Sequence, residues 1–163
     1  MQTKVNALKV QIDQSKNVKQ LMLLDSLSGL TRNKPEFQYD SIVRKTIDLA
    51  KKLDSINLAA MHTANLINFN NNIVGKPEVA IELFNNLMHE YKDISSDAAL
   101  CQLFINTADS YYYTGEVLKS VEFYKVANKH AKKINSERLM GLAKLYEGYS
   151  HSHLGNFSEA SIR

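Results

Sequence analysis

Apolar residues recur along most of this chain at intervals of three and four positions. Leu83 and Leu87 follow this spacing, and so do Val117, Val121 and Tyr124. A helix places residues three and four apart on one face, whereas a strand turns alternate residues to opposite faces. The pattern therefore predicts an all-α chain without strands.

Glycines interrupt the helical pattern at a fixed interval. Gly75, Gly115 and Gly155 follow one another 40 residues apart. Each is followed five positions later by a small residue, namely Ala80, Ser120 and Ala160. Glycine adopts the left-handed backbone conformation at little cost, which suits a tight turn between helices. We therefore expect all three glycines in interhelical turns.

Polar clusters form a second set of interruptions with a similar interval. They are Asp54-Ser55, Ser95-Ser96-Asp97 and Asn135-Ser136, and such residues cap helix N-termini. Two interruptions per period predict two helices per period. Pro35 and Pro77 are expected where second helices begin, because the first turn of a helix tolerates proline. A single hairpin cannot bury its apolar face, so the hairpins must stack.

Small residues also recur within the predicted helices. Ala80, Ala108, Ser120 and Gly148 keep the same phase relative to the glycines. They are expected where helices cross closely. The run Asn70-Asn71-Asn72 falls within a first helix, and because asparagine is a poor helix former a compensating interaction is expected there.

These positions resemble the tetratricopeptide repeat family. The best match runs through Phe104, Ala108, Tyr111, Gly115, Ser120, Tyr124 and Ala127, with Thr107 in place of the usual Leu. The preceding repeat keeps Gly75, Ala80 and Phe84 but has Asn68 and Asn71 where a small residue and an aromatic are usual. The period of 40 exceeds the usual ~34 residues and looks like the longer repeats of bacterial regulators.

The resemblance implies an α-solenoid of antiparallel helix hairpins with a right-handed superhelical twist. It covers about 3.5 repeats, at approximately 16–54, 55–95, 96–135 and 136–163, the last truncated. Residues 1–15 are expected to form an N-terminal extension or linker. The chain ends about one turn into the second helix of a repeat, which predicts a fragment of a longer protein.

Composition and charge exclude several function classes. The formal net charge is only +3, from 20 basic and 17 acidic residues, which does not predict a nucleic-acid partner. No apolar run approaches the ~20 residues that span a membrane, so no membrane contact is expected. A cytoplasmic location is favoured, and the exported side of a bacterial membrane stays open. Cys101 is the only cysteine and is expected to be a small buried residue.

No catalytic or metal-binding pattern is present, so we predict neither an enzyme nor a cofactor. His151 and His153 are two apart, which on a helix turns them about 200° from each other, whereas paired metal ligands are three or four apart. The basic run of α-helical spacing, which comprises Lys125, Lys129, Lys132 and Lys133, is expected to be a solvated face. A patch for an acidic partner is the alternative.

The resemblance places a partner-binding groove along the first helices of the repeats. The matching positions are His62, Asn65, Phe69, Asn72, Gln102, Ile105, Asp109, Tyr112, Tyr113 and Tyr149. Amide side chains can pair with both the N–H and C=O groups of an extended peptide, and aromatic rings serve as anchors. None of these positions is Lys or Arg, so clamping of a peptide carboxylate is not expected.

The favoured function is a non-catalytic module that binds a protein or peptide as a scaffold or sensor. The resemblance suggests a larger bacterial signalling protein around it, such as a nucleotide cyclase or a histidine kinase. Two alternatives stay open: a self-association module that forms a homodimer, and a peptide-sensing regulator. Self-association is expected to use apolar residues near the C-terminus, namely Leu142, Leu145, Tyr149 and Leu154.

Overall fold

The computed structural model describes residues 1–155, and this part of the chain is all-helical. Its α-helices are α1 (Gln2–Asp13), α2 (Asn17–Thr31), α3 (Tyr39–Lys52), α4 (Ile56–Phe69), α5 (Pro77–Glu90), α6 (Asp97–Tyr113), α7 (Val117–Lys133) and α8 (Glu137–His153). A 3₁₀ turn, η1 (Pro35–Phe37), precedes α3, and a π-helical turn, η2 (Asn70–Val74), prolongs α4. No strand occurs among residues 1–155, which confirms the predicted all-α class.

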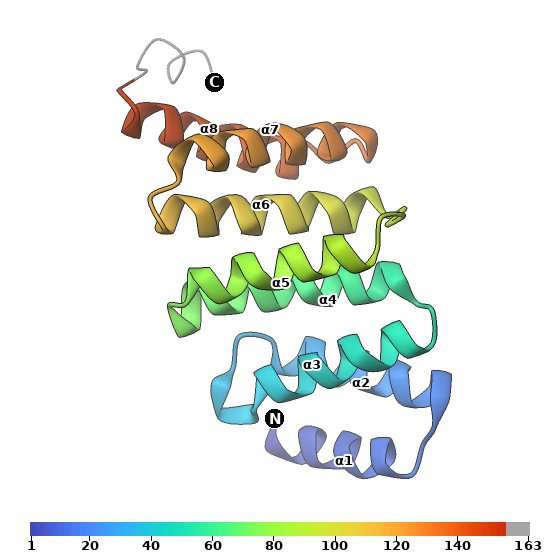
Figure 1. Ribbon diagram of the computed structural model, residues 1–163. Coiled ribbons are helices and arrows are strands. Elements are labelled where there is room, and N and C mark those ends of the chain that lie inside the picture. The colour runs from blue at the N-terminus through green and yellow to red at the C-terminus, as the bar shows by residue number, and fades with distance from the viewer. Residues whose placement is uncertain (156–163) are drawn as a thin grey trace.

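Each helix packs against the next one along the chain. In addition, α4 packs against α6, and α6 contacts α8. Figure 1 shows the helices stacked from α1 at one end to α7 and α8 at the other. The chain therefore builds its interior stepwise, from neighbours in sequence.

The three predicted turn glycines all have left-handed backbone conformations. The φ angles of Gly75, Gly115 and Gly155 are 71°, 84° and 78°. Gly75 and Gly115 lie in the turns before α5 and α7, and Gly155 lies in the turn after α8, next to its C-cap residue Leu154. An added Cβ would meet nothing within 4 Å at any of them, so the backbone conformation rather than lack of space favours glycine. The matching small residue after Gly155, Ala160, lies outside the described residues.

The polar clusters mark helix starts as predicted. The Ser96 hydroxyl accepts a hydrogen bond from the Ala99 N–H at 3.2 Å, and Ser136 accepts one from Leu139 at 3.4 Å. Ser55 occupies the corresponding position before α4 without a side-chain capping bond. Pro77 begins α5, but Pro35 begins η1 rather than α3, because a left-handed residue intervenes at Gln38, with φ of 60°.

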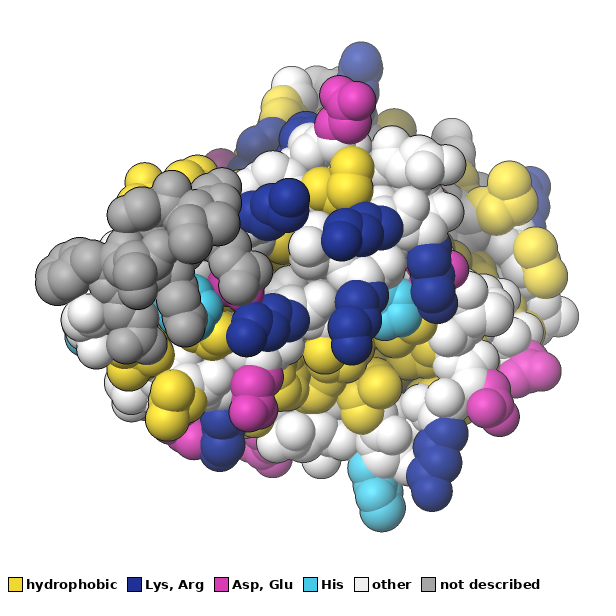
Figure 2. Space-filling model, turned by 90° about the horizontal axis from the view of Figure 1, so that it is seen from above, with side chains coloured by type: hydrophobic (Ala, Val, Ile, Leu, Met, Phe, Trp, Pro, Cys, Tyr) yellow, Lys and Arg dark blue, Asp and Glu magenta, His cyan; other side chains and the backbone are white. Residues whose placement is uncertain are grey.

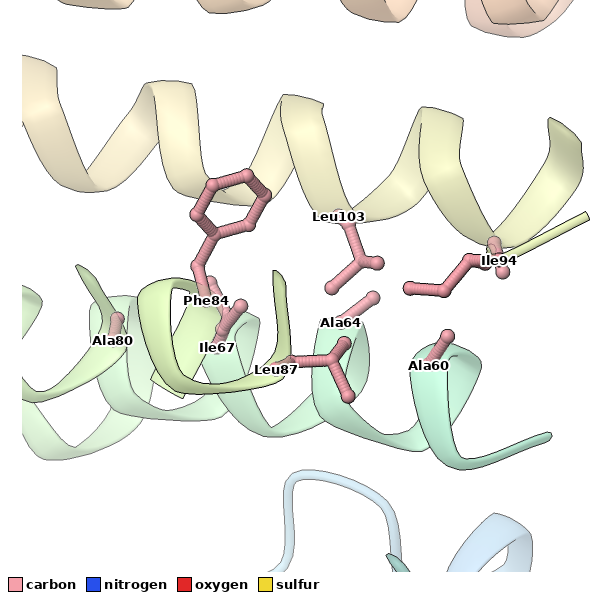
Figure 3. Packing of buried hydrophobic residues seen from close by; sticks show 9 residues of the cluster. Ala60, Ala64, Ile67, Ala80, Phe84, Leu87, Ile94 and Leu103 are labelled. Carbon is pink, nitrogen blue, oxygen red and sulfur yellow. The ribbon is translucent and has the colours of Figure 1, made fainter. Parts of the chain in front are cut away.

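The core contains a large apolar cluster between α4, α5 and α6. Figure 3 shows its side chains, among them Ala64, Ile67 and Phe84, pointing toward one another from these helices. Ala80, Ala108 and Ser120 are fully buried, as expected of small residues at close helix crossings. Gly148 is partly buried.

Residues 1–15 differ from the expected extension, because most of them form α1. Val5 and Ile12 are buried in an apolar cluster with Leu24 and Leu27 of α2. With Leu8, which packs at the edge of this cluster, they form a helical stripe that gives α1 a face to bury. The N-terminal segment is therefore part of the packed fold. No helix within residues 1–155 is long and apolar enough to cross a membrane.

Candidate functional site

A groove of about 740 Å³ lies along α4, α6 and α8. Each helix contributes residues three or four positions apart, so one side of each helix faces the groove. From α4 and η2 come Asn65, Asn68 and Asn72, from α6 come Gln102, Ile105, Asn106, Asp109, Tyr112 and Tyr113, and from α8 come Arg138, Leu142, Tyr146, Tyr149, Ser150, Ser152 and His153. Arg32 and Asn33 after α2 and Tyr124 of α7 complete the lining.

The structure brings most of the residues predicted for a groove together in this lining. Those that line it are Asn65, Asn72, Gln102, Ile105, Asp109, Tyr112, Tyr113 and Tyr149. Whether they contact a partner stays a prediction.

The other two predicted groove residues, His62 and Phe69, lie in the interior instead. Each is only 3% exposed, on the side of α4 that faces α2 and α3. The Phe69 ring packs edge-on against Tyr39 with 5.0 Å between centroids, and His62 Nε2 lies 2.8 Å from Asp25 Oδ1. Around the axis of α4, His62 and Phe69 lie only about 40–60° from Asn65. This small angular difference is enough to place a side chain in the core instead of the groove.

Sequence reasoning missed several lining residues, and two of them change the electrostatics. Arg32 and Arg138 both line the groove, so the expectation of a groove without Lys or Arg is wrong. Helical spacing back from Leu142 points to Arg138, whereas Arg32 directly follows α2 and has no periodic signal. No ion pair within residues 1–155 includes either arginine.

Asp109 is the one carboxylate among the described residues of the lining. The Tyr124 hydroxyl donates a hydrogen bond to Asp109 Oδ1. Burial raises the pKa of Asp109 to about 6, although the hydrogen bond from Tyr124 acts in the opposite direction. The pKa of Tyr124 is raised as well, by burial and then by the charge of Asp109. The groove thus holds a carboxyl group whose ionised form is poorly stabilised by the protein.

Tyrosine rings surround this part of the groove. The rings of Tyr124 and Tyr146 have centroids 5.8 Å apart, and those of Tyr146 and Tyr149 are 6.2 Å apart. Tyr112 and Tyr113 also lie 6.2 Å apart, edge to face. Tyr113 and Tyr149 are 53% and 57% exposed, so part of this aromatic surface is open to a ligand.

The asparagine run is held by a buried polar network that joins η2 to α6. Asn71 Nδ2 donates to the Asn106 carbonyl at 2.7 Å, and the Ser110 hydroxyl donates to Asn71 Oδ1 at 2.8 Å. Asn106 Nδ2 in turn donates to the Ala64 carbonyl at 2.8 Å. This network is a compensating interaction of the kind expected for the run, and it fixes the end of α4 beside the groove. The π-helical form of the run was not predicted.

Three amide side chains among the described residues of the lining are left without a protein partner, and one of them, Asn33 after α2, has its Oδ1 buried. Asn65 of α4 and Gln102 of α6 make no side-chain hydrogen bond to any other residue of the described chain. An amide has both donors and acceptors, so each presents unused hydrogen-bonding groups to the groove.

The basic run on α7 forms a solvated face, away from the groove lining. Lys125, Lys129, Lys132 and Lys133 are all exposed. Figure 2 looks onto the end of the stack formed by α7 and α8 and shows Lys and Arg side chains spread over it with apolar ones between. Lys133 pairs with Asp97 at 3.1 Å, so this charge is partly compensated. An acidic partner for the face stays an untested alternative.

Metal-ligating side chains are not clustered in the described part of the chain. Within residues 1–155, no group of three or more His, Cys, Asp or Glu side chains is arranged to hold a metal ion. Cys101 is fully buried, and burial raises the pKa of its thiol to about 11. A thiol with this pKa stays protonated at neutral pH, and Cys101 lies in the interior as a small buried residue.

Comparison with known proteins assigns no family to the chain. A scan against models of protein families and a search among curated proteins both found no match. The tetratricopeptide resemblance therefore stays a prediction, and function must be inferred from the groove.

Proposed function

We propose that this chain is a non-catalytic binding module whose groove takes a short extended segment of a peptide or protein. The observation that carries the proposal is that two of the amides without protein partners, Asn65 and Gln102, lie on neighbouring helices of one groove. A polar group that loses water without gaining a hydrogen bond costs free energy. A ligand that presents both N–H and C=O groups would satisfy both amides, and a peptide backbone presents them at every residue.

The dimensions of the groove suit a short peptide. Packed helices lie about 8–10 Å apart, so the distance from α4 across α6 to α8 is ~20 Å. An extended chain rises about 3.3 Å per residue, so about six residues would cover it. The exposed rings of Tyr113 and Tyr149 would provide apolar contact area for the side chains of such a peptide.

We propose in addition that the helices form a tetratricopeptide-like α-solenoid with a right-handed twist. Three hairpins, α2–α3, α4–α5 and α6–α7, would be its repeats, with α8 as the first helix of the next. Support comes from the left-handed glycines before α5 and α7, and from the packing of α4 against α6. The family resemblance, rather than the groove, suggests a sensor or scaffold segment of a larger bacterial signalling protein, such as a nucleotide cyclase or a histidine kinase.

The proposal is tested with an array of synthetic hexapeptides of random sequence and the purified 163-residue chain. We expect sequence-selective binding that is lost when Asn65→Ala and Gln102→Ala are combined. The matched control is Asn85→Ala, which removes an exposed amide from α5 outside the groove. Failure to bind any peptide, or binding that the double substitution leaves intact, would overturn the proposal.

Self-association is a second candidate, favoured by two exposed apolar side chains on α8. Leu145 is 49% exposed and Tyr149 is 57% exposed, four positions apart on one side of the helix. The other two residues predicted for this role, Leu142 and Leu154, are partly buried. Light scattering at high micromolar concentration should then find a dimer that Leu145→Lys dissociates and Asn72→Ala leaves intact. A strict monomer would remove this candidate.

A further inference from the structure

Among the described residues of the lining, the groove has one position of negative charge, Asp109, and aromatic rings lie around it. We propose that Asp109 and its neighbouring tyrosines seat a cationic side chain, above all an arginine, of the peptide bound in the groove. This inference rests on the proposed peptide-binding function and adds to it the chemistry of one ligand residue.

Asp109 has a carboxylate oxygen to offer a ligand. The hydrogen bond from Tyr124 occupies Oδ1, and no other hydrogen bond or ion pair to Asp109 is formed within residues 1–155. The side chain is half-buried and faces the groove, so Oδ2 is the atom left for a ligand. A buried carboxylate is stabilised best by a cation that also donates hydrogen bonds, which a guanidinium does with two parallel N–H groups.

The rings beside Asp109 favour the same class of ligand group. The pKa of the Tyr113 hydroxyl is raised, first by burial and next by the negative charge of Asp109, which shows that the two side chains are close. Tyr124 donates its hydrogen bond to Asp109, its ring centroid lies 5.8 Å from that of Tyr146, and the Tyr146 centroid lies 6.2 Å from that of Tyr149. A cation within about 6 Å of a ring face is attracted by its quadrupole, and the planar guanidinium also stacks on rings.

The two groove arginines do not already neutralise Asp109. Neither Arg32 nor Arg138 forms an ion pair with it, and the pKa of Asp109 is set by burial and by Tyr124 rather than by either guanidinium. Positive and negative charges are therefore separate in the lining. A ligand with only anionic groups would leave Asp109 without a partner, whereas a basic side chain at this position would complement it.

The experiment compares arginine with citrulline, which has nearly the same shape and no charge. Hexapeptide libraries are acetylated and amidated, so that no terminal charge contributes, and one position at a time is fixed as arginine or citrulline. Fluorescence polarisation with the full chain should show at least tenfold tighter binding of the best arginine library than of its citrulline counterpart. Asp109→Asn, which keeps an acceptor for Tyr124, should lower arginine binding to the citrulline level and leave citrulline binding unchanged.

Asp93→Asn is the matched control, because Asp93 is exposed in the segment between α5 and α6, outside the groove lining. This variant should keep the full preference for arginine. Melting curves establish that both variants are folded.

The possible outcomes distinguish failure of the cation site at Asp109 from failure of peptide binding in the groove. Equal binding of arginine and citrulline libraries that still requires Asn65 and Gln102 would overturn the cation site and leave the peptide groove standing. A preference for arginine that survives Asp109→Asn would also overturn the cation site. If neither library binds, the peptide-binding function itself fails.

Discussion

The two sides of α4 and α6 differ in what the fold gives their residues. On the side that faces α5, Ala64, Ile67 and Leu103 are fully buried and belong to one continuous apolar cluster. On the groove side, Gln102 has no hydrogen-bond partner within the described chain, and Asp109 is a half-buried carboxylate that accepts a hydrogen bond only from Tyr124. The first side stabilises the fold, and the second keeps polar groups that the fold leaves unused.

Because of this difference, substitutions on the two sides should affect the free energy of unfolding differently. Substitutions in the apolar cluster remove favourable packing and must destabilise. Substitutions in the groove remove groups that contribute little to folding or that oppose it, so they should be neutral or stabilising. Proteins tolerate such local cost where a site serves binding. The four predictions below run from the largest expected effect to the smallest.

The largest loss is expected when Leu103 is truncated to alanine. Leu103 is 0% exposed, and its removal leaves a cavity between α4, α5 and α6. The free energy of unfolding, measured by urea denaturation, should fall by about 2–5 kcal/mol. Leu118→Ala on the exposed surface of α7, where the side chain is 69% accessible, is the control and should change stability by less than about 0.5 kcal/mol. Equal effects of the two changes would contradict the packing of α6.

Overpacking the interior at a neighbouring cluster should cost somewhat less. Ala108 is 0% exposed on α6, within the cluster shared with α7 and α8. Ala108→Leu should lower the free energy of unfolding by about 1–3 kcal/mol, because the larger side chain forces neighbouring helices apart. A neutral melting result would mean that helices do not cross closely at this position.

Asp109→Asn should act in the opposite direction and stabilise the protein at pH 7. The pKa of Asp109 is about 6 in the folded protein, above its ordinary value of 3.8, so the folded state binds the proton more tightly than the unfolded state. Stability from this group is therefore present at low pH and falls as the pH rises from about 4 to 6. Removing the charge should raise the free energy of unfolding at pH 7 by about 1–2 kcal/mol, after allowance for solvent screening.

The pH dependence of the stability difference between wild type and Asp109→Asn serves as the control. Urea denaturation of wild type and variant should give a difference that shrinks toward pH 4, where Asp109 is protonated in the folded protein. A difference that is constant with pH would show that the effect is one of packing and not of charge.

The smallest effect on stability is expected for Gln102→Ala. Its amide has no partner within residues 1–155, so its removal leaves no internal group unsatisfied. The free energy of unfolding, measured by urea denaturation, should change by no more than about 0.5 kcal/mol, which is the range of ordinary surface substitutions. A loss above about 1 kcal/mol would mean that Gln102 supports the fold, and the groove would lose one of its amides without a protein partner.

The sequence predicts the local features of this fold well. Gly75 and Gly115 are favoured by the left-handed backbone of their turns, and Ser96 and Ser136 cap unpaired N–H groups at helix starts. Both features depend on residues only a few positions apart in the sequence, so the sequence alone reveals them. The helical stripe is local in the same way. Even α1 carries such a stripe, although its residues were expected to be an extension outside the fold.

The groove was predicted less completely, because its lining depends on how far each helix is rotated. His62 and Phe69 are turned only slightly away from Asn65, yet they lie in the core. Tyr124 reaches the groove from α7, a helix that the repeat pattern assigns to the other layer, and Arg32 does so from the segment after α2. Tyr124 and Arg32 therefore reach the groove through tertiary structure that residue spacing does not encode.

The central claim is that the groove side of α6 carries groups kept for a ligand at the expense of stability. One measurement tests it most directly: urea unfolding of wild type and Asp109→Asn at pH 7, each with and without a saturating concentration of the tightest-binding arginine hexapeptide. A ligand that binds only the folded state adds stability according to its affinity. We expect Asp109→Asn to be the more stable protein without peptide and to gain little from it, whereas wild type gains clearly. A variant that is no more stable than wild type and gains as much from the peptide would contradict the account.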